Sequence, residues 1–134
     1  MATYLVDSNI LLDVISESQE WFEWSSRVLE DAADQGRIVV NPVIYSEVSV
    51  RFSRIEMLDD ALDSVLVERE AIPWEAAFLA GKCFQKYRRR GGTKVLPLPD
   101  FFIGAHAAVA GYTILTRDSM RYKTYFPTLP IVAP

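Results

Sequence analysis

The sequence predicts an α/β protein in which a central, mostly parallel sheet of four or five strands is flanked by helices. Two patterns in the sequence predict this class. Short apolar runs, which are typical of buried strands, alternate with longer segments whose apolar residues recur at helical spacing. Strands that alternate with helices in this way form parallel sheets. The 134 residues, 50% of them hydrophobic and 24% charged, correspond to a single domain, 1–134, with a core of its own.

Local signals define the elements of the first half. The apolar run that begins at residue 3 ends on Asp7, and Gly36 ends a long helix before the apolar run "RIVV". Asn41 followed by Pro42 is the expected cap and first-turn pair of the next helix. We therefore expect a strand at 3–7, helices at 9–16 and 19–35, a strand at 37–40, helices at 42–52 and 56–66, and a weak strand near 69–72.

The second half continues the alternation. Apolar residues recur at helical spacing from Trp74 to Phe84 and predict a helix that reaches Arg90, where "RGGTK" breaks it. Asp100 begins a helix of small residues that Gly111 ends. We expect the remaining elements to be a strand at 112–116, a short helix at 118–124 and a strand near 131–133.

Acidic residues stand where the strands of this sheet should end. Asp7 ends the first strand, Asp118 follows the strand at 112–116, and Asp100 begins the helix that leads into that strand. Open parallel sheets bind ligands beyond the carboxyl ends of their strands, where the winding direction reverses, so these three side chains should share one edge. For Asp7 alone, the alternative is an ordinary helix cap.

Glu47 is the fourth candidate. It borders an apolar stripe on the helix that leaves the strand at 37–40, which is typical of a side chain that reaches solvent or of a functional group in a cleft. Four carboxylates in one crevice repel one another, so a cation must neutralise them. The fold could bring a Lys or Arg close, but a divalent metal is the more economical answer. With one His and one Cys in the chain, Mg²⁺ or Mn²⁺ fits better than zinc.

Four segments carry a resemblance to a known family. They are "YLVDSNILLD" at 4–13, "SEV" at 46–48, "RRRGGTKVLPLPDFFIGAHAAVAGY" at 88–112 and "ILTRDSMRY" at 114–122. Together they resemble the motifs of PIN-domain ribonucleases, most closely the VapC-type toxins of toxin–antitoxin pairs. The resemblance implies a PIN-like three-layer sandwich, Mg²⁺- or Mn²⁺-dependent endoribonuclease activity, a homodimer and inhibition by a cognate VapB-type antitoxin. It places the site at Asp7, Glu47, Asp100 and Asp118, with Asn9 and Thr116 in the polar positions that line it.

The expected chemistry is hydrolysis of an RNA phosphodiester by metal-activated water, which leaves 5′-phosphate and 3′-hydroxyl ends. We expect Asp7 and Asp100 to be the main metal ligands. Glu47 and Asp118 would bind metal directly, through water or at a second site. Thr116 would orient a carboxylate or a water, with an ordinary strand threonine as the alternative. For Asn9 the alternative is an ordinary polar residue at the start of a helix.

The net charge of −4 argues at first against a nucleic-acid partner, but removing the four site acids leaves a charge of 0. The candidates for contact with RNA phosphates are Arg88, Arg89, Arg90, Lys94 and Arg117. For the run at 88–94, the alternative is a solvated helix end whose cations interact with the helix dipole.

Three other features have competing interpretations. Trp21, Phe22 and Trp24 predict an antitoxin or dimer contact, with core packing as the alternative. Asp13 is expected on a solvated helix face, with a place at the edge of the pocket as the alternative. His106 is expected as a packed or surface imidazole without a catalytic role. Gly104, one turn after Asp100, is expected to be a packing glycine, with open space above the acid as the alternative.

Other classes fit less well. A haloacid-dehalogenase-like phosphatase needs a second acid two residues after Asp7, where this chain has Asn9, and a receiver domain would carry its phosphorylated Asp after a later strand. The main alternative is a catalytically inactive PIN-fold module that binds RNA or protein. No apolar run approaches the roughly 20 residues that span a bilayer. A lone cysteine, Cys83, fits a reducing cytoplasm, where we expect the protein.

Overall fold

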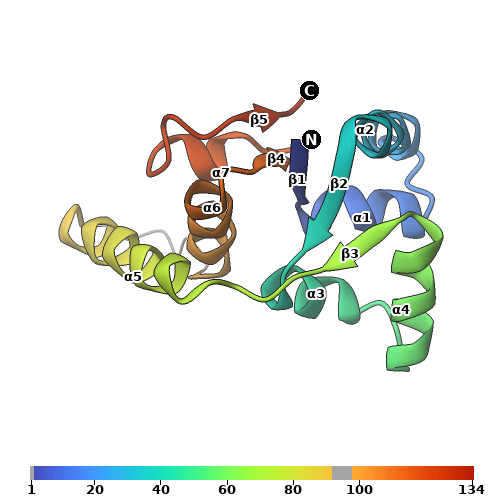
Figure 1. Ribbon diagram of the computed structural model, residues 1–134, viewed down its shortest axis with the longest axis horizontal. Helices are drawn as coiled ribbons and strands as arrows, with labels where there is room; N and C mark the ends of the chain where they lie inside the picture. Colours follow the sequence, from blue (N-terminus) through green and yellow to red (C-terminus); the bar gives the residue numbers. More distant parts are fainter. Residues whose placement is uncertain (1, 92–97) are drawn as a thin grey trace.

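The computed structural model describes residues 2–91 and 98–134, which are coloured along the sequence in Figure 1. Its strands are β1 (Ala2–Val6), β2 (Gly36–Val40), β3 (Val67–Arg69), β4 (Thr113–Leu115) and β5 (Ile131–Val132). Its helices are α1 (Ser8–Ile15), α2 (Phe22–Gln35), α3 (Pro42–Ser49), α4 (Ile55–Ser64), α5 (Trp74–Arg89), α6 (Leu98–Ala110) and α7 (Met120–Lys123). The predicted order of elements is confirmed over these residues.

The strands form one sheet in the order β3-β2-β1-β4-β5, and every neighbouring pair is parallel. The predicted α/β class is therefore confirmed. From β1 the chain moves outward through β2 to β3, and it then returns to β4 on the other side of β1. The winding direction thus reverses between β1 and β4, which is where open parallel sheets bind ligands. Val6 pairs with Leu115, so the segments that follow these two strands start side by side.

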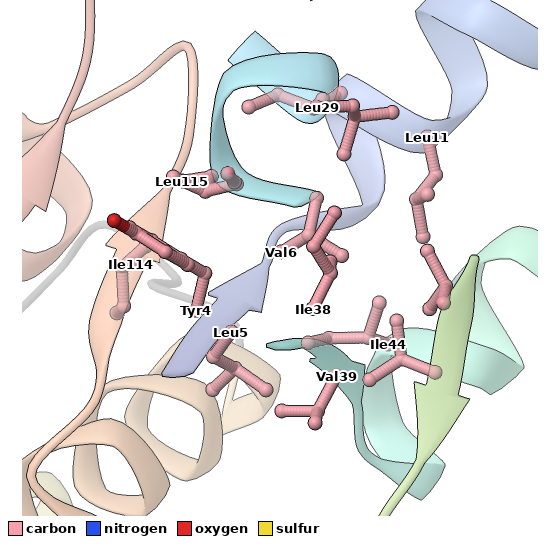
Figure 2. Packing of buried hydrophobic residues seen from close by; sticks show 14 of the residues in the cluster. Tyr4, Leu5, Val6, Leu11, Leu29, Ile38, Val39, Ile44, Ile114 and Leu115 are labelled. Atoms are coloured by element: carbon pink, nitrogen blue, oxygen red, sulfur yellow. The ribbon is translucent and has the colours of Figure 1, made fainter. Parts of the chain in front are cut away.

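Helices cover the sheet and bury its apolar side chains. In Figure 1, α5 and α6 lie on one side of the strands, and α1 and α2 lie on the other. Figure 2 shows Leu5, Val39 and Ile114 of the strands packed in the core with Leu11 and Leu29 of the helices, and each of the five is 5% exposed or less. Burial on both faces explains why the strands are continuous apolar runs.

A second apolar cluster joins α5 to α6 beside the first turn of α6. Cys83 is buried and packs in it with Phe101 and Phe126. A Cβ added at Gly104 would lie 2.4 Å from the ring of Phe126. Gly104 is therefore a packing glycine, and the alternative of open space above Asp100 is wrong.

Side-chain caps and one close backbone contact explain the element starts near the site. Asp7 caps α1, and Asn41 caps α3, where its Oδ1 accepts a hydrogen bond from the Ile44 N–H at 2.9 Å. Gly36 begins β2 beside β1, and a Cβ there would come within 1.8 Å of the carbonyl oxygen of Ala2. These local features fix where α1 and α3 leave the carboxyl edge of the sheet.

Some boundaries differ from the prediction. α3 ends at Ser49, three residues early, because the chain tightens into a turn there. β3 begins two residues before its predicted start, because Leu66, with a φ of 61°, already turns the chain out of α4. Among the described residues, none of the helices is long and apolar enough to cross a membrane.

Candidate functional site

Three of the four predicted acids meet around one arginine at the carboxyl edge of the sheet. Arg121 Nη1 lies 4.0 Å from Asp7 Oδ2 and 3.8 Å from Asp100 Oδ1. Arg121 Nε donates a hydrogen bond to Asp118 Oδ2 at 3.2 Å. We refer to Asp7, Glu47, Asp100 and Asp118 as the acidic cluster. Its nearest cation is thus a side chain of the protein itself.

Each acid enters the acidic cluster from a different element. Asp7 follows β1, and Asp118 follows β4, its neighbour in the sheet. Asp100 stands in the first turn of α6, and Glu47 lies on α3. Side chains separated by more than 100 residues are therefore brought together by the reversal of winding between β1 and β4.

Asp7 is fully buried, and its carboxylate accepts hydrogen bonds from three directions. Oδ1 accepts from the Ser8 N–H at 2.8 Å. Oδ2 accepts from the hydroxyls of Thr116 at 2.9 Å and Tyr122 at 2.8 Å. The contact with Ser8 belongs to the helix cap, so Asp7 caps α1 and faces the acidic cluster at the same time.

Thr116 and Asn9 link the ends of the two central strands. Besides donating to Asp7, Thr116 Oγ1 accepts from the Asp118 N–H at 3.1 Å and from Asn9 Nδ2 at 3.4 Å. Asn9 Oδ1 accepts from the Arg117 N–H at 3.2 Å. These contacts tie the loop after β4 to the start of α1, so Thr116 and Asn9 lie beside the acids as predicted from the motif positions.

Arg121 and Tyr122 face the acidic cluster from α7, and the sequence analysis missed both. Tyr122 is fully buried, and burial, followed by the negative charge of Asp7, raises its pKa well above the usual value, so its hydroxyl stays protonated and donates. In the sequence Tyr122 resembles a core residue of a short helix. A signal existed for Arg121, because it lies three residues after Asp118 and such pairs share one helical face.

Two of the acids are disfavoured as anions. Burial raises the pKa of Asp100 from its ordinary value of 3.8 to about 6, against the opposing effect of Arg121. Burial, followed by the charge of Asp7, also raises the pKa of Glu47. Glu47 Oε1 is buried and has no hydrogen-bond partner among the described residues. Since a buried oxygen without a partner is unfavourable, the acidic cluster has an oxygen ligand that the chain itself leaves unused.

The donor set suits a hard divalent cation, because every candidate ligand is a carboxylate oxygen. The spacing of the acids, in contrast, does not suit a metal ion. In residues 2–91 and 98–134, no three side chains of Asp, Glu, His or Cys lie close enough together to hold one. Asp7 and Asp100 contact Nη1 of Arg121, and Asp118 contacts Nε. The three aspartates are thus arranged around a guanidinium group, which is larger than a metal ion.

Arg117 pairs with Asp13 instead of extending into solvent. Its Nε and Nη2 donate to the two carboxylate oxygens at 2.7 and 3.1 Å, and its guanidinium lies over the ring of Trp21. Asp13 also accepts from the Ser25 hydroxyl at 2.7 Å and is 4% exposed. The prediction that Asp13 lies on a solvated helix face is therefore wrong, because a two-pronged arginine contact makes its burial possible.

The predicted basic run lies at the end of α5. Its described members are all exposed: Arg88, Arg89 and Arg90. Arg90 lies over the ring of Tyr125, and that ring packs against Phe101, the residue after Asp100. Exposed arginines are thus connected through two aromatic rings to the first turn of α6. Lys94, the fourth member of the run, lies outside the described residues.

The aromatic residues before and within α2 are mostly packed. Trp21 and Trp24 are partly buried and contact each other edge to face, with 5.9 Å between ring centroids. Trp24 also packs against the main core, and Trp21 lies beneath Arg117. Phe22 is 36% exposed. Core packing therefore explains Trp24, whereas Trp21 packs against Trp24 and Arg117, and Phe22 has the most exposed ring of the three.

His106 of α6 belongs to a polar network with Asn41, which caps α3, and Glu70, which follows β3. Its Nδ1 lies 3.1 Å from Asn41 Nδ2, and its Nε2 lies 3.0 Å from Glu70 Oε2. Because Asn41 Oδ1 already caps α3, the Asn41 amide nitrogen faces His106 and donates to Nδ1. His106 is therefore neutral, with its Nε2–H donating to Glu70, and burial lowers its pKa. The predicted packed imidazole is confirmed.

Comparisons with known proteins agree with this architecture. A model of the PIN domain family matches residues 4–127, a range that contains the whole acidic cluster. No curated protein sequence matches the chain.

Several solved structures are similar to this one over nearly the whole chain. One is the crystal structure of VapBC2 from Rickettsia felis bound to a DNA fragment from its promoter. It has a TM-score of 0.74 at 18% identity, and the match covers 98% of each chain. VapBC-1 from nontypeable Haemophilus influenzae has a TM-score of 0.71 at 15% identity, with 98% of this chain and 97% of that chain covered. A toxin–antitoxin complex from Klebsiella pneumoniae has a TM-score of 0.68 at 23% identity, with the same coverage. At these identities the likeness shows the fold.

Proposed function

This chain belongs to the PIN domain family. We propose that it is a metal-dependent endoribonuclease of the VapC toxin type. The observation that supports the proposal most is the convergence of Asp7, Asp100 and Asp118 on one cation at the strand ends. Three carboxylates around one guanidinium leave a surplus of negative charge that an ion pair alone does not require. Such a surplus suits a site that binds a metal ion and a phosphate.

We assign Mg²⁺ or Mn²⁺ to the acidic cluster, with Asp7 and Asp100 as principal ligands and Glu47 and Asp118 as further ligands, directly or through water. The unpartnered Oε1 of Glu47 and the all-oxygen donor set support this assignment. Such an ion, when bound, lowers the pKa of a coordinated water and offsets charge on phosphate oxygens. Hydrolysis by water needs no ribose 2′-hydroxyl, so the RNA ends should be 5′-phosphate and 3′-hydroxyl.

The side chains around the acids have separate tasks. Thr116 and Tyr122 hold Asp7 in one orientation by donating to the same carboxylate oxygen. Asp100 stands in the first turn of α6, where the helix dipole favours a carboxylate and partly opposes the effect of burial. Glu47, with its raised pKa, is suited to accept a proton from the attacking water.

RNA is the proposed substrate, and the exposed arginines at 88–90 with Lys94 are the proposed phosphate contacts, since phosphate backbones are bound mainly by Lys and Arg. Arg117 is a weaker candidate, because its guanidinium is engaged with Asp13. We propose a cytoplasmic location, where the free Cys83 stays reduced.

The proposed partners are a VapB-type antitoxin and a second copy of the chain. One of the similar solved structures is a toxin–antitoxin complex, which supports an antitoxin for this chain too. The segment with Trp21, Phe22 and Trp24 is the proposed contact, and its most exposed aromatic ring belongs to Phe22.

Digestion of total cellular RNA tests the proposed activity. The wild type should cleave with Mg²⁺ or Mn²⁺ and not with EDTA, while Asp7→Asn and Asp100→Asn should lose cleavage. Asp34→Asn removes an exposed carboxylate on α2 and serves as the matched control. Cleavage that survives both cluster substitutions, or products with 2′,3′-cyclic phosphates, would contradict the proposal.

One observation favours a catalytically inactive module as the second candidate. Arg121 contacts three of the four acids, so the acidic cluster is partly neutralised without any metal. Isothermal titration with Mg²⁺ and Mn²⁺ separates the two candidates, because an inactive module should bind neither ion strongly.

A further inference from the structure

Arg121 occupies the position that the proposed function gives to the divalent ion. Its guanidinium lies 3.2 to 4.0 Å from carboxylate oxygens of Asp7, Asp100 and Asp118. In the described part of the chain, no other Lys or Arg makes an ion pair with these three acids. The chain therefore provides its own counter-cation at the centre of the site.

We propose that Arg121 competes with the divalent ion for the carboxylates of the acidic cluster and so sets the metal affinity of the site. The inference rests on the proposed function, because it assumes that the acidic cluster binds metal. In the metal-free protein Arg121 limits the repulsion among the acids. When a divalent ion binds, Arg121 leaves the carboxylates.

The contacts of Arg121 allow such an exchange. Two of its three ion-pair distances are long, at 3.8 and 4.0 Å, and its side chain is 37% exposed. The acid partners Asp7 and Asp100 are buried, so Arg121 stays paired with them while the site holds no metal. A divalent ion that neutralises the same acids removes this need, and the partly exposed guanidinium can then move into solvent. The neighbouring Tyr122 is fully buried and hydrogen-bonded to Asp7, so α7 stays in place when Arg121 moves.

Because of its shape, the Arg121 guanidinium cannot occupy the acidic cluster at the same time as a divalent ion. Mg²⁺ needs its oxygen ligands at about 2.0 to 2.1 Å, in near-octahedral geometry. Asp118 contacts Nε, whereas Asp7 and Asp100 contact Nη1, and no three acids among the described residues are close enough to enclose an ion. The carboxylates can move together around an ion only after Arg121 has left.

Titration calorimetry with Mn²⁺ tests the competition directly. Arg121→Gln should bind Mn²⁺ about tenfold more tightly than the wild type, a difference of about 1.4 kcal/mol. The matched control is Arg69→Gln, which removes the same charge from an exposed pair with Asp59 at 3.3 Å and should leave the affinity unchanged. Arg121→Lys keeps the charge but loses the fork of donors, so its affinity should be intermediate.

Thermal unfolding gives a second readout that does not depend on activity. In EDTA, Arg121→Gln should unfold at a lower temperature than the wild type, because the acids repel one another. Saturating Mn²⁺ should raise its unfolding temperature more than that of the wild type. Circular dichroism checks the fold of each variant, and Arg121→Lys keeps the test available if Arg121→Gln does not fold.

The outcomes separate this inference from the proposed function. Equal or weaker Mn²⁺ binding by Arg121→Gln, with the wild type still binding, would overturn the role of Arg121 alone. Failure of the wild type and both Arg121 variants to bind Mn²⁺ would overturn the metal site itself. Binding by Arg121→Gln at concentrations where the wild type binds nothing would support the competition most strongly.

Discussion

Replacing Asp100 by Asn should stabilise the metal-free protein while it removes a ligand of the proposed metal site. The Asp100 side chain is 8% exposed, and burial is the main cause that raises its pKa from 3.8 to about 6. Each pH unit of pKa change is about 1.4 kcal/mol, so keeping Asp100 ionised in the fold at pH 7.5 is unfavourable by about 3 kcal/mol. The pKa of about 6 already includes the attraction between Asp100 and Arg121, so no separate loss is subtracted for Asn, which has the same shape without the charge. The expected gain in the free energy of unfolding is about 2 to 3 kcal/mol.

Urea unfolding in EDTA at pH 7.5 and pH 5 checks this prediction. Folded wild type takes up a proton at Asp100 as the pH falls through about 6, whereas the unfolded chain does so near 3.8. The wild type therefore gains stability from this group as the pH falls, and the advantage of Asp100→Asn should shrink at pH 5. The exposed Asp34→Asn variant should show no comparable change. The reasoning is refuted if Asp100→Asn is no more stable than the wild type at pH 7.5, or if its advantage is the same at both pH values.

Three further predictions concern the surroundings of the acids. Tyr122→Phe removes one of two hydroxyl donors to Asp7 Oδ2 and should lower the free energy of unfolding by about 1 to 3 kcal/mol in urea titrations; an unchanged midpoint would show that the hydrogen bond contributes nothing. The pKa of His106 is lowered by burial, so its contribution to stability should be present above its ordinary pKa of 6.5 and lost as the pH falls below it. His106→Gln should remove this part of the pH dependence, and identical pH profiles for both proteins would contradict the neutral, buried imidazole. Gly104→Ala places a Cβ 2.4 Å from the ring of Phe126 and should destabilise the fold by about 1 to 3 kcal/mol in thermal unfolding, with partial rescue by Phe126→Leu; a neutral effect would mean that the ring moves freely.

The acids could be predicted from the sequence because their positions depend on local signals. Asp7 directly follows an apolar strand, and Asp118 stands three residues after the end of another strand. Once the strands are parallel and the winding reverses between them, both residues must lie at one edge of the sheet. The position of Asp100 could be predicted in the same way, because Asp100 stands at the start of α6, the helix that leads into β4. Strand ends and helix starts are features that sequence patterns indicate well.

The contacts that the cations make could not be predicted in this way. Arg121 and Arg117 lie on either side of Asp118, yet one reaches the acidic cluster and the other reaches Asp13. Which acid each long side chain contacts depends on the direction of a four-residue helix and on the space around it. The burial of Asp13 has the same origin, because only the tertiary fold brings a two-pronged donor to it. A charged residue on a helix looks solvated until its partner is known.

The balance of charge in the acidic cluster connects these observations to function. One guanidinium contacts three of the four carboxylates, and burial raises the pKa of both Asp100 and Glu47. A site that served stability alone would hold Asn or Gln at these positions, since neutral side chains avoid the repulsion and the loss of hydration. Arg121 reduces the repulsion among the acids in the metal-free protein. In the described residues, however, the acids around it lie too far apart to hold a metal ion. A divalent ion would relieve the repulsion among these acids and use their oxygens as ligands. The residues that destabilise the metal-free fold are therefore the same residues that we propose for its chemistry.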